Sequence, residues 1–228
     1  MKKQIAVIGL GRFGTSLAAT LFSMGHDVLA LDKDEKRIQN VASQLTHAVQ
    51  ADATNEAILK ELGIGNFDVA VVSMGSSIES SVLSTILLKK LGVSFVVARA
   101  ENKLHGEILD KIGADKVVYA EREIATSVAH WITLSDVVEY ISVAPKYGVS
   151  KLIAPPYLVG KSLSSLQLVR EGKWGVAVLL IQREKEVIIS PGRTEIIKPN
   201  DILIVAGNDD NLEQLLANAK KKKLEEEQ

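Results

Sequence analysis

The chain of 228 residues contains no cysteine, and aromatic residues make up only 4% of it. The absence of cysteine excludes disulfide bonds, thiol catalysis and cysteine-ligated metals. No apolar stretch reaches the length of a membrane-spanning helix, and the N-terminal lysines precede a strand pattern instead of a signal-peptide core. The 27 basic and 28 acidic residues nearly balance, so the charge excess typical of nucleic-acid-binding proteins is missing. We expect a soluble, cytoplasmic protein without a nucleic-acid partner.

Two reaction types also lack their residues. The sequence has no G-x-x-x-x-G-K-[ST] loop, which disfavours P-loop hydrolysis. A hydride-transfer enzyme needs a second domain that supplies a proton donor or acceptor. The region from Lys151 onward contains no histidine and no obvious lysine–acid or tyrosine–lysine arrangement. The sequence therefore predicts a binding protein and not an enzyme.

A glycine-rich fingerprint stands near the N-terminus. The apolar run Gln4–Leu10 leads into G-L-G-R-F-G at residues 9–14, a helical pattern follows, and a second apolar run ends at Asp32. Such a loop lets backbone N–H groups approach a diphosphate at a helix N-terminus, and the acid can accept hydrogen bonds from both hydroxyls of a ribose. Arg12 adds a positive charge suited to a terminal phosphate. The fingerprint predicts nucleotide binding; the alternative is a strand–helix turn made only for close packing.

Apolar runs and helical patterns alternate over the first 120 residues. Six runs read as strands: Gln4–Leu10, Asp27–Asp32, Ala48–Asp52, Asp68–Met74, Ser94–Ala100 and Lys116–Tyr119. Helical patterns that end before a glycine lie between them, among them Thr54–Leu62, Ile78–Leu91 and Leu104–Ile112. This alternation predicts an α/β fold, a Rossmann-like doubly wound parallel sheet.

An apolar stripe follows the last of these strands. Within Glu121–Ile141 the apolar residues recur at near-helical spacing, at Ile124, Val128, Trp131, Ile132, Val138 and Ile141. The spacing predicts one helix, which packs on its own domain or crosses to a partner subunit. We favour the crossing, because the six-stranded core is already covered.

The region beyond residue 150 has the pattern of a small α+β unit. Short strand-like runs occupy Lys151–Ala154, Val176–Gln182, Val187–Ser190 and Asp201–Ala206. The charged turn Arg183–Glu186 predicts a hairpin, Ser162–Val169 a short helix and Asn211–Ala219 a last helix before a charged, solvated tail.

Polar residues follow the ends of the predicted parallel strands, where ligands of such sheets bind. Asp52 with Ala53 is placed to contact an adenine, and Gly75 allows close approach of a ribose. Asp52 and Ser76 are equally compatible with helix N-caps.

Two further residues near this edge carry alternatives. Glu121 follows the sixth strand and either binds a cation that bridges phosphates or begins the next helix, where an acid offsets the dipole. His105 opens the helix after the fifth strand, at the ligand edge of the sheet, where a phosphate or a ribose would be within its reach.

These motifs are similar to those of RCK domains (regulators of potassium conductance), the cytoplasmic regulators of bacterial potassium uptake systems of the Ktr and Trk type. The resemblance is carried by I-A-V-I-G-L-G-R-F-G at Ile5–Gly14, L-D-K-D at Leu31–Asp34, A-D-A-T at Ala51–Thr54 and K-I-G-A-D-K-V-V-Y-A-E-R-E at Lys111–Glu123. It covers nearly the whole chain and is closest to single-RCK regulators of the Ktr type. It implies a nucleotide-binding lobe over 1–121, a crossover and dimerisation helix over 122–144, and a small α+β C-terminal lobe with a charged tail over 145–228.

The resemblance also implies a site for ATP and ADP. Its residues would be Gly9, Gly11, Arg12, Phe13, Gly14, Asp32, Lys33, Asp34, Asp52, Ala53, Met74, Gly75, Ser76, Arg99, Ala100, Glu101, His105 and Glu121. Asp32 would bind the adenosine ribose and His105 would reach the phosphates. Arg12 would approach the γ-phosphate, often that of a neighbouring subunit, and Glu121 would hold Mg²⁺ or another cation.

By the same resemblance, homodimers would assemble into an octameric ring on a membrane potassium channel subunit, at the inner face of the membrane. The C-terminal lobe of related proteins binds cyclic di-AMP at a dimer interface, and the segment for it here would be Ile153–Pro156 with Arg170 and Trp174–Ala177. An NAD(H)-binding dehydrogenase or redox sensor stays the main alternative, since Asp32 suits NAD equally well. A third interpretation is a pure assembly module, in which the nucleotide has only a structural role.

Overall fold

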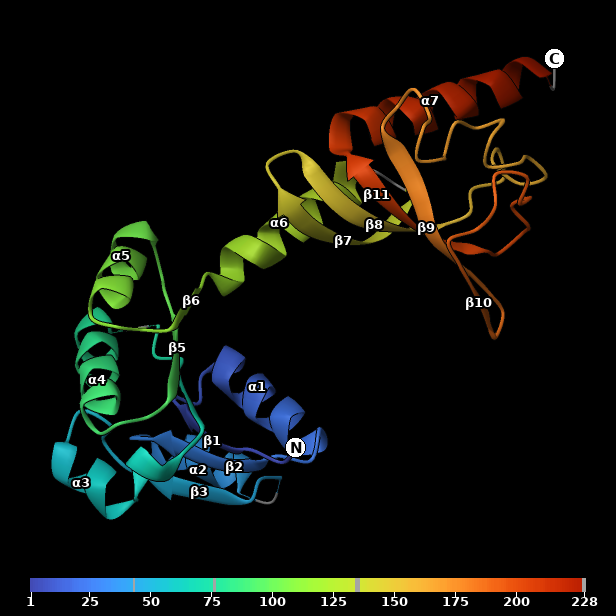
Figure 1. Ribbon diagram of the computed structural model, residues 1–228. Helices are drawn as coiled ribbons and strands as arrows, with labels where there is room; N and C mark the ends of the chain where they lie inside the picture. Colours follow the sequence, from blue (N-terminus) through green and yellow to red (C-terminus); the bar gives the residue numbers. More distant parts are fainter. Residues whose placement is uncertain (43, 76, 134–135, 227–228) are drawn as a thin grey trace. The chain divides into compact units, whose positions relative to one another are not determined.

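The computed structural model describes residues 1–42, 44–75, 77–133 and 136–226 (Figure 1). The chain divides into two compact units, Met1–Ala120 and Glu121–Gln228. Each unit has its own core and is described by itself.

The first unit is a six-stranded sheet in which every neighbouring pair of strands is parallel. Its strands are β1 (Gln4–Ile8), β2 (Asp27–Asp32), β3 (His47–Gln50), β4 (Val69–Val72), β5 (Phe95–Arg99) and β6 (Lys116–Val118). The helices are α1 (Arg12–Ser23), α2 (Glu35–Val41), α3 (Glu56–Glu61), α4 (Ile78–Lys90) and α5 (Lys103–Lys111), with a 3₁₀ turn at Ile64–Asn66. The strand order β3-β2-β1-β4-β5-β6 is that of dinucleotide-binding folds, so the predicted doubly wound sheet is confirmed.

Both faces of this sheet are buried, which explains the continuous apolar runs in the sequence. Ile5 and Val7 of β1 pack in one cluster with residues of α1 and α2. Ala6 and Ile8, on the opposite face of the same strand, pack with residues of α3, α4 and α5. Alternate residues of one strand therefore reach two different cores.

The topology places a crevice beside β1. The chain crosses from β1 to β2 on one side and from β3 to β4 on the other, so the strand order reverses at the carboxyl ends of β1 and β4. In open parallel sheets, ligands bind at this reversal.

The second unit is a five-stranded antiparallel sheet with the order β10-β9-β11-β8-β7. Its elements are α6 (Ala120–Thr133), β7 (Val137–Ala144), β8 (Tyr147–Ile153), β9 (Val176–Arg183), β10 (Glu186–Ile189), β11 (Ile202–Asn208) and α7 (Asp209–Glu226). Arg183 pairs with Glu186 across the β9–β10 turn, as predicted for the hairpin. The last helix is confirmed and is longer than predicted.

One face of this second sheet carries the core of the unit. Leu152, Ile181, Leu203 and Val205 are buried there, together with leucines of α7. On the other face the strand register lines up apolar residues that are exposed or half-buried. We call this set the open face: Ile141, Ile153, Leu180, Val187, Ile189, Ile202 and Ile204. On the same face, Nζ of Lys151 and Oε1 of Glu139 form an ion pair of 2.8 Å.

Of the helices predicted in this unit, one is shorter than predicted and one is wrong. The helix predicted over Glu121–Ile141 ends at Thr133, and residues 137–144 form strand β7. The β-branched residues Val137, Val138, Ile141 and Val143 favour a strand, and only their spacing imitated a helix. The segment Ser162–Val169 forms turns, with Gln167 at φ 60° and a bridge from Ser162 to Ile196.

Candidate nucleotide-binding site

The glycine loop connects β1 to α1 and leaves open space in front of the helix. Gly9 has φ 91°, and a Cβ on Gly9 would lie 2.8 Å from Cγ of Met74. A Cβ on Gly14 would overlap with the carbonyl oxygen of Gly9. Gly11 has nothing within 4 Å of its Cβ position and caps α1 without a side-chain hydrogen bond. The start of α1 thus has open space at Gly11 and no side-chain cap, and the first N–H groups of a helix have no partner within it, which suits an anion.

This loop borders a cavity of about 500 Å³ at the carboxyl edge of the parallel sheet, a volume typical of ligand pockets. The cavity is lined by Ile8, Gly9, Gly11, Arg12, Leu31, Asp32, Lys33, Arg37, Ala51, Asp52, Ala53, Ser73, Met74, Gly75, Ser77, Ser80, Arg99 and Glu101. Most of the residues predicted for the site are therefore brought together around one hollow.

Asp32 is one of the acids that line this cavity, and it is 7% exposed. Its Oδ2 accepts hydrogen bonds from Leu10 N at 2.6 Å and from Arg37 Nη1 at 3.3 Å, and its Oδ1 accepts from Asp34 N at 2.9 Å. A carboxylate offers about four acceptor positions, so one on Oδ1 stays open. Asp34 does not line the cavity; it caps α2 by accepting from Lys36 N.

Asp52 forms a turn ahead of α3 and not its cap. Its Oδ1 accepts from the N–H and the hydroxyl of Thr54, which lower the pKa of the carboxyl below its usual value. Asn55 caps α3, so the reading of Asp52 as an N-cap is wrong. Ser77 caps α4, and Ser76 lies outside the described residues.

Two arginines line the cavity near the glycine loop and the end of β5. Arg12 is exposed at the start of α1, and Arg99 comes from the end of β5 with its guanidinium 6.0 Å from the ring centre of Phe13. A Cβ on Gly75 would overlap with the Arg99 guanidinium. Gly75 thus makes room for Arg99, which the sequence did not indicate. Phe13 is half-buried behind the loop.

Some predicted residues lie outside the lining. Gly14 packs behind the loop, and Ala100 is 1% exposed. His105 is also 1% exposed; its Nδ1 accepts from Glu101 N at 3.3 Å, and burial lowers the pKa of its imidazole despite the nearby Glu101 carboxylate. Glu121 is exposed in the first turn of α6 and belongs to the second unit, so its cation role stays a prediction.

Sequence reasoning missed Arg37, Ser73, the α4 N-cap Ser77 and Ser80 of α4, which all line the cavity. Ser73 follows β4 directly and donates to the carbonyl oxygens of Ile8 and Gly9, so its place at a strand end was a usable signal. Arg37 lies one turn into the helix after Asp32, and helix geometry brings such a residue back to the strand end.

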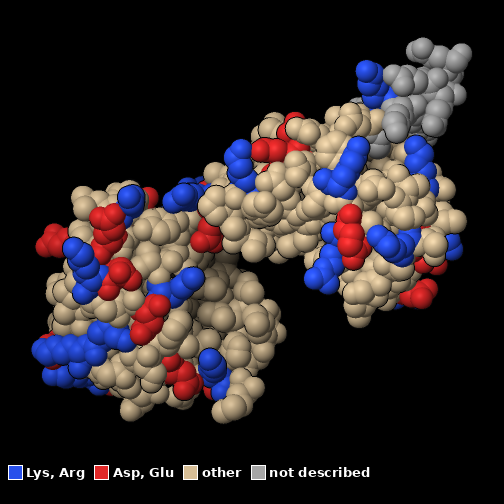
Figure 2. Space-filling view, turned by 45° about the horizontal axis from the view of Figure 1, so that its top comes forward, with Lys and Arg blue, Asp and Glu red and all other residues tan. Residues whose placement is uncertain are grey.

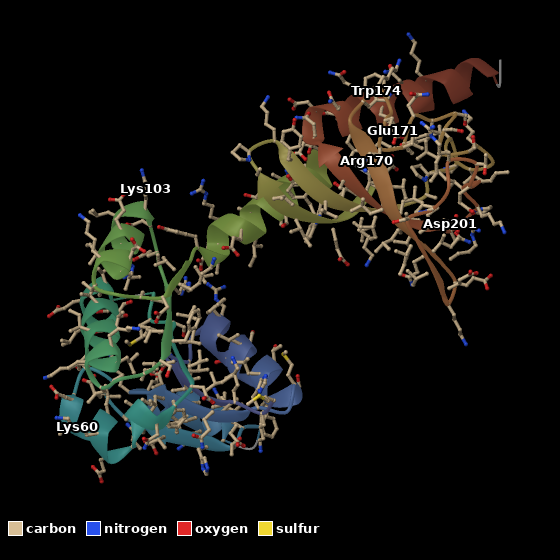
Figure 3. All side chains as sticks on the ribbon, in the orientation of Figure 1. Lys60, Lys103, Arg170, Glu171, Trp174 and Asp201 are labelled. Carbon is tan, nitrogen blue, oxygen red and sulfur yellow. The ribbon has the colours of Figure 1, made fainter. Side chains whose placement is uncertain are left out.

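The residues predicted for cyclic di-AMP all lie in the second unit: Ile153–Pro156 at and after the end of β8, and Arg170 with Trp174–Ala177 before and within β9 (Figure 3). Arg170 is exposed. Trp174 is half-buried under the Lys173 ammonium at 4.7 Å, and its carbonyl accepts from Asn211 of α7 at 2.8 Å. These contacts hold the segment to α7; a ligand there stays a prediction.

Metal and membrane features are missing from the part of the chain that the structure describes. It holds no cluster of three or more acidic or histidine side chains able to bind a metal. No helix in the described ranges is both long and apolar enough to cross a membrane. On the face in Figure 2, basic and acidic side chains are interspersed over each unit.

Comparisons with known proteins agree with this architecture. The TrkA-N domain matches residues 5–120 and the TrkA-C domain residues 150–220. The Ktr system potassium uptake protein C of Bacillus subtilis is 42% identical over 208 residues, which are 91% of this chain and 93% of that protein.

Two solved structures share the fold. The GsuK channel bound to NAD has a TM-score of 0.61 at 16% identity, covering 93% of this chain and 38% of that one. GsuK bound to ADP has a TM-score of 0.50 at 17% identity, covering 60% of this chain and 36% of that one. The chain thus spans less than half the length of these channel chains. On the domain matches and the identity to the Bacillus protein, the chain belongs to the TrkA family of Ktr- and Trk-type potassium uptake proteins.

Proposed function

We propose that this chain is the regulatory subunit of a Ktr-type potassium uptake system, which binds ATP and ADP and controls a separate membrane channel subunit. The observation that carries the proposal is the shared cavity of the glycine loop and Asp32, in a chain of this family. The protein acts by binding and not by catalysis, and it sits in the cytoplasm at the inner face of the membrane.

The nucleotide lies along the carboxyl edge of the parallel sheet. Its phosphates meet the N-terminus of α1 with Arg12 and Arg99, its ribose meets Asp32, and its adenine lies near Asp52 and Ala53. The other residues named for the site, including His105 and Glu121, complete or support it, with Glu121 holding Mg²⁺ or another cation at the phosphates.

ATP and ADP differ only in the third phosphate. The two nucleotides can therefore favour different shapes of an assembly only through contacts to that phosphate. Arg12 and the cation at Glu121 supply those contacts. Moving an assembly from mostly closed to mostly open requires about 5 kcal/mol of differential binding, which several sites in a ring provide together.

Assembly into homodimers and then an octameric ring is part of the proposal. It is supported by apolar side chains that the second unit leaves exposed, on α6 (Ile124, Trp131 and Ile132) and on the open face of its sheet. A large uncovered apolar surface marks an interaction site. The divisions 1–121, 122–144 and 145–228 are then a nucleotide lobe, a subunit-crossing segment, and a lobe for a second ligand such as cyclic di-AMP.

An NAD(H)-responsive sensor is the second candidate. Asp32 favours it, because the acid recognises an unmodified ribose in NAD as well as in ATP. Arg12 opposes it, since a guanidinium at the loop crowds the nicotinamide half of a dinucleotide.

Calorimetric titration of nucleotide-free protein with ATP, ADP and NADH, with Mg²⁺ present, tests the proposal. We expect micromolar or tighter binding of ATP and ADP and much weaker binding of NADH. Arg12→Ala should still bind both nucleotides but lose the preference between them in a channel-activation assay, while Lys36→Ala, an exposed residue outside the cavity lining, should behave like wild type. Tightest binding of NADH would overturn the proposal.

A further inference from the structure

We propose that His105 is a positioning residue of the nucleotide cavity. Its neutral imidazole holds the backbone of Glu101, a residue that lines the cavity, so that protonation of this one side chain weakens nucleotide binding. The inference rests on the proposed function, because it concerns the same cavity. It assigns His105 a role outside the cavity lining, in place of direct contact with phosphates.

His105 makes a reciprocal pair of hydrogen bonds at the start of α5, which resembles a capping box except that the donor to its side chain is the residue before the N-cap. Asn102 is the N-cap, and its side chain accepts the N–H of His105 at 2.9 Å. In return, Nδ1 of His105 accepts the N–H of Glu101 at 3.3 Å. In most capping boxes the residue at this third helical position is Glu or Gln. Here the acceptor is an imidazole, which gains a proton near neutral pH.

The hydrogen bond fixes the tautomer of the ring. Because Nδ1 accepts, the proton of the neutral imidazole is on Nε2. Nε2 is buried and has no hydrogen-bond partner among the described residues. A buried donor without a partner is unfavourable, so packing alone gives no reason to prefer His over Gln at this position.

Protonation would convert the acceptor at Nδ1 into a donor that faces another donor, the N–H of Glu101. It would also place a charge where the side chain is 1% exposed. Burial accordingly lowers the pKa of His105 from its usual value, opposed by the Glu101 carboxylate. The neutral form is therefore the one the fold requires.

The surrounding elements supply little to stabilise the charged form. The helix α4 and the strand β6 pack against α5 (Figure 1). On α4, Lys89 pairs with Asp115, Lys90 pairs with Glu56, and Glu79 is exposed. On β6, Lys116 is exposed, and beyond it the Tyr119 hydroxyl lies against Gly106. Glu101 is the group whose charge acts on the imidazole.

The loss of this hydrogen bond affects the cavity through Glu101. Glu101 lines the cavity, and Arg99, two residues earlier at the end of β5, lines it as well. Loss of the Glu101 N–H bond frees the backbone at Glu101, whereas Arg99 stays paired with β6 and the N–H of Ala100 keeps its bond to the carbonyl oxygen of Val118. Nucleotide binding therefore favours neutral His105, and by linkage a bound nucleotide must lower the pKa of that histidine further.

The test compares ADP binding to the full-length protein at pH 8.0 and pH 5.0 by calorimetry, in wild type, His105→Gln and His105→Ala. Gln supplies an acceptor that does not titrate, so His105→Gln should keep the wild-type affinity at pH 8.0. Wild type should lose about fivefold more affinity than His105→Gln on acidification, and His105→Ala should bind weakly at both pH values. The comparison uses one ligand, so titration of the phosphates cancels. His47→Gln, at an exposed histidine of β3, is the control and should keep the wild-type profile.

Equal pH profiles of wild type and His105→Gln would overturn the inference. Failure of wild type to bind ADP at pH 8.0 would instead refute the proposed function. If His105→Gln does not fold, an NMR titration of the wild-type imidazole with and without saturating ADP replaces it. A pKa of His105 that ADP leaves unchanged or raises contradicts the inference.

Discussion

The two sheets of this chain differ in how their faces are covered. The parallel sheet of the first unit has helices on both faces and a cavity of about 500 Å³ at its carboxyl edge. The antiparallel sheet of the second unit has a core on one face and leaves the open face apolar and uncovered. The first unit therefore offers an edge to a small ligand, and the second offers a face to another protein surface.

This contrast separates two roles that a regulatory protein must join. A cavity built from loop backbone and strand ends can distinguish one small molecule from another. An apolar sheet face has little ligand selectivity and is suited to contact with another apolar surface. Substitutions at the edge and at the face should accordingly change different properties.

The largest effect is expected at the edge, from Gly14→Ala. The added Cβ, in the first turn of α1, would overlap with the Gly9 carbonyl oxygen. That oxygen belongs to the loop backbone, which cannot move aside without breaking the turn. We expect a loss of about 3 kcal/mol in the free energy of unfolding, measured by urea denaturation, together with loss of nucleotide binding.

Gly11→Ala is the matched control for this change. Gly11 has φ −69° and open space around its Cβ position, so alanine fits the fold. Its stability should stay near that of wild type, while nucleotide affinity falls because the methyl group enters the anion site. Equal destabilisation by both variants would contradict the distinction between loop packing and ligand space.

An intermediate effect is expected at the open face, from Ile153→Glu. Ile153 is 53% exposed and lies opposite Ile202, so a carboxylate there costs the unit itself little. A charge buried in a subunit interface should raise the dimer dissociation constant about 100-fold, or about 2.7 kcal/mol. Sedimentation over a range of concentrations measures it, with Met24→Glu, 65% exposed in the first unit, as control. An unchanged distribution of oligomers would show that this face is not the interface.

The same contrast explains how much of the fold the sequence could predict. Strands buried on both faces are continuous apolar runs, so β1 to β6 were predicted with ends within two residues of the observed ones. A strand with one open apolar face has no strict alternation, so Val138 and Ile141 of β7 were read as the continuation of a helix. Only the pairing of β7 with β8 distinguishes the two readings.

The candidate site shows the same limit. Asp32 and the glycine loop follow from local spacing, and the structure brings them together. The burial of His105 and the close approach of Arg99 to Gly75 depend on how α5 and β5 pack against their neighbours, which no short motif encodes. Asp52 and Asn55 are both good capping residues, and which of them caps α3 is decided by where the chain turns after β3.

The smallest effect should come from Arg37→Met, which tests how the edge recognises a ribose. The Asp32 carboxylate has one open acceptor position, and Arg37 occupies another. The ion pair joins Nη1 of Arg37 to Oδ2 of Asp32 at 3.3 Å, and the arginine side chain is 49% exposed. An exposed pair of this kind contributes about 0–1 kcal/mol, so a ribose hydroxyl displaces it at small cost. Removing the guanidinium should raise ADP affinity up to about fivefold, with a smaller gain for 2′-deoxy-ADP, which has one hydroxyl fewer to use the freed position. Lys36→Met, on the same helix but outside the cavity lining, should change neither. Weaker ADP binding by Arg37→Met would mean that the guanidinium contacts the ligand itself and that the edge recognises more than the ribose hydroxyls.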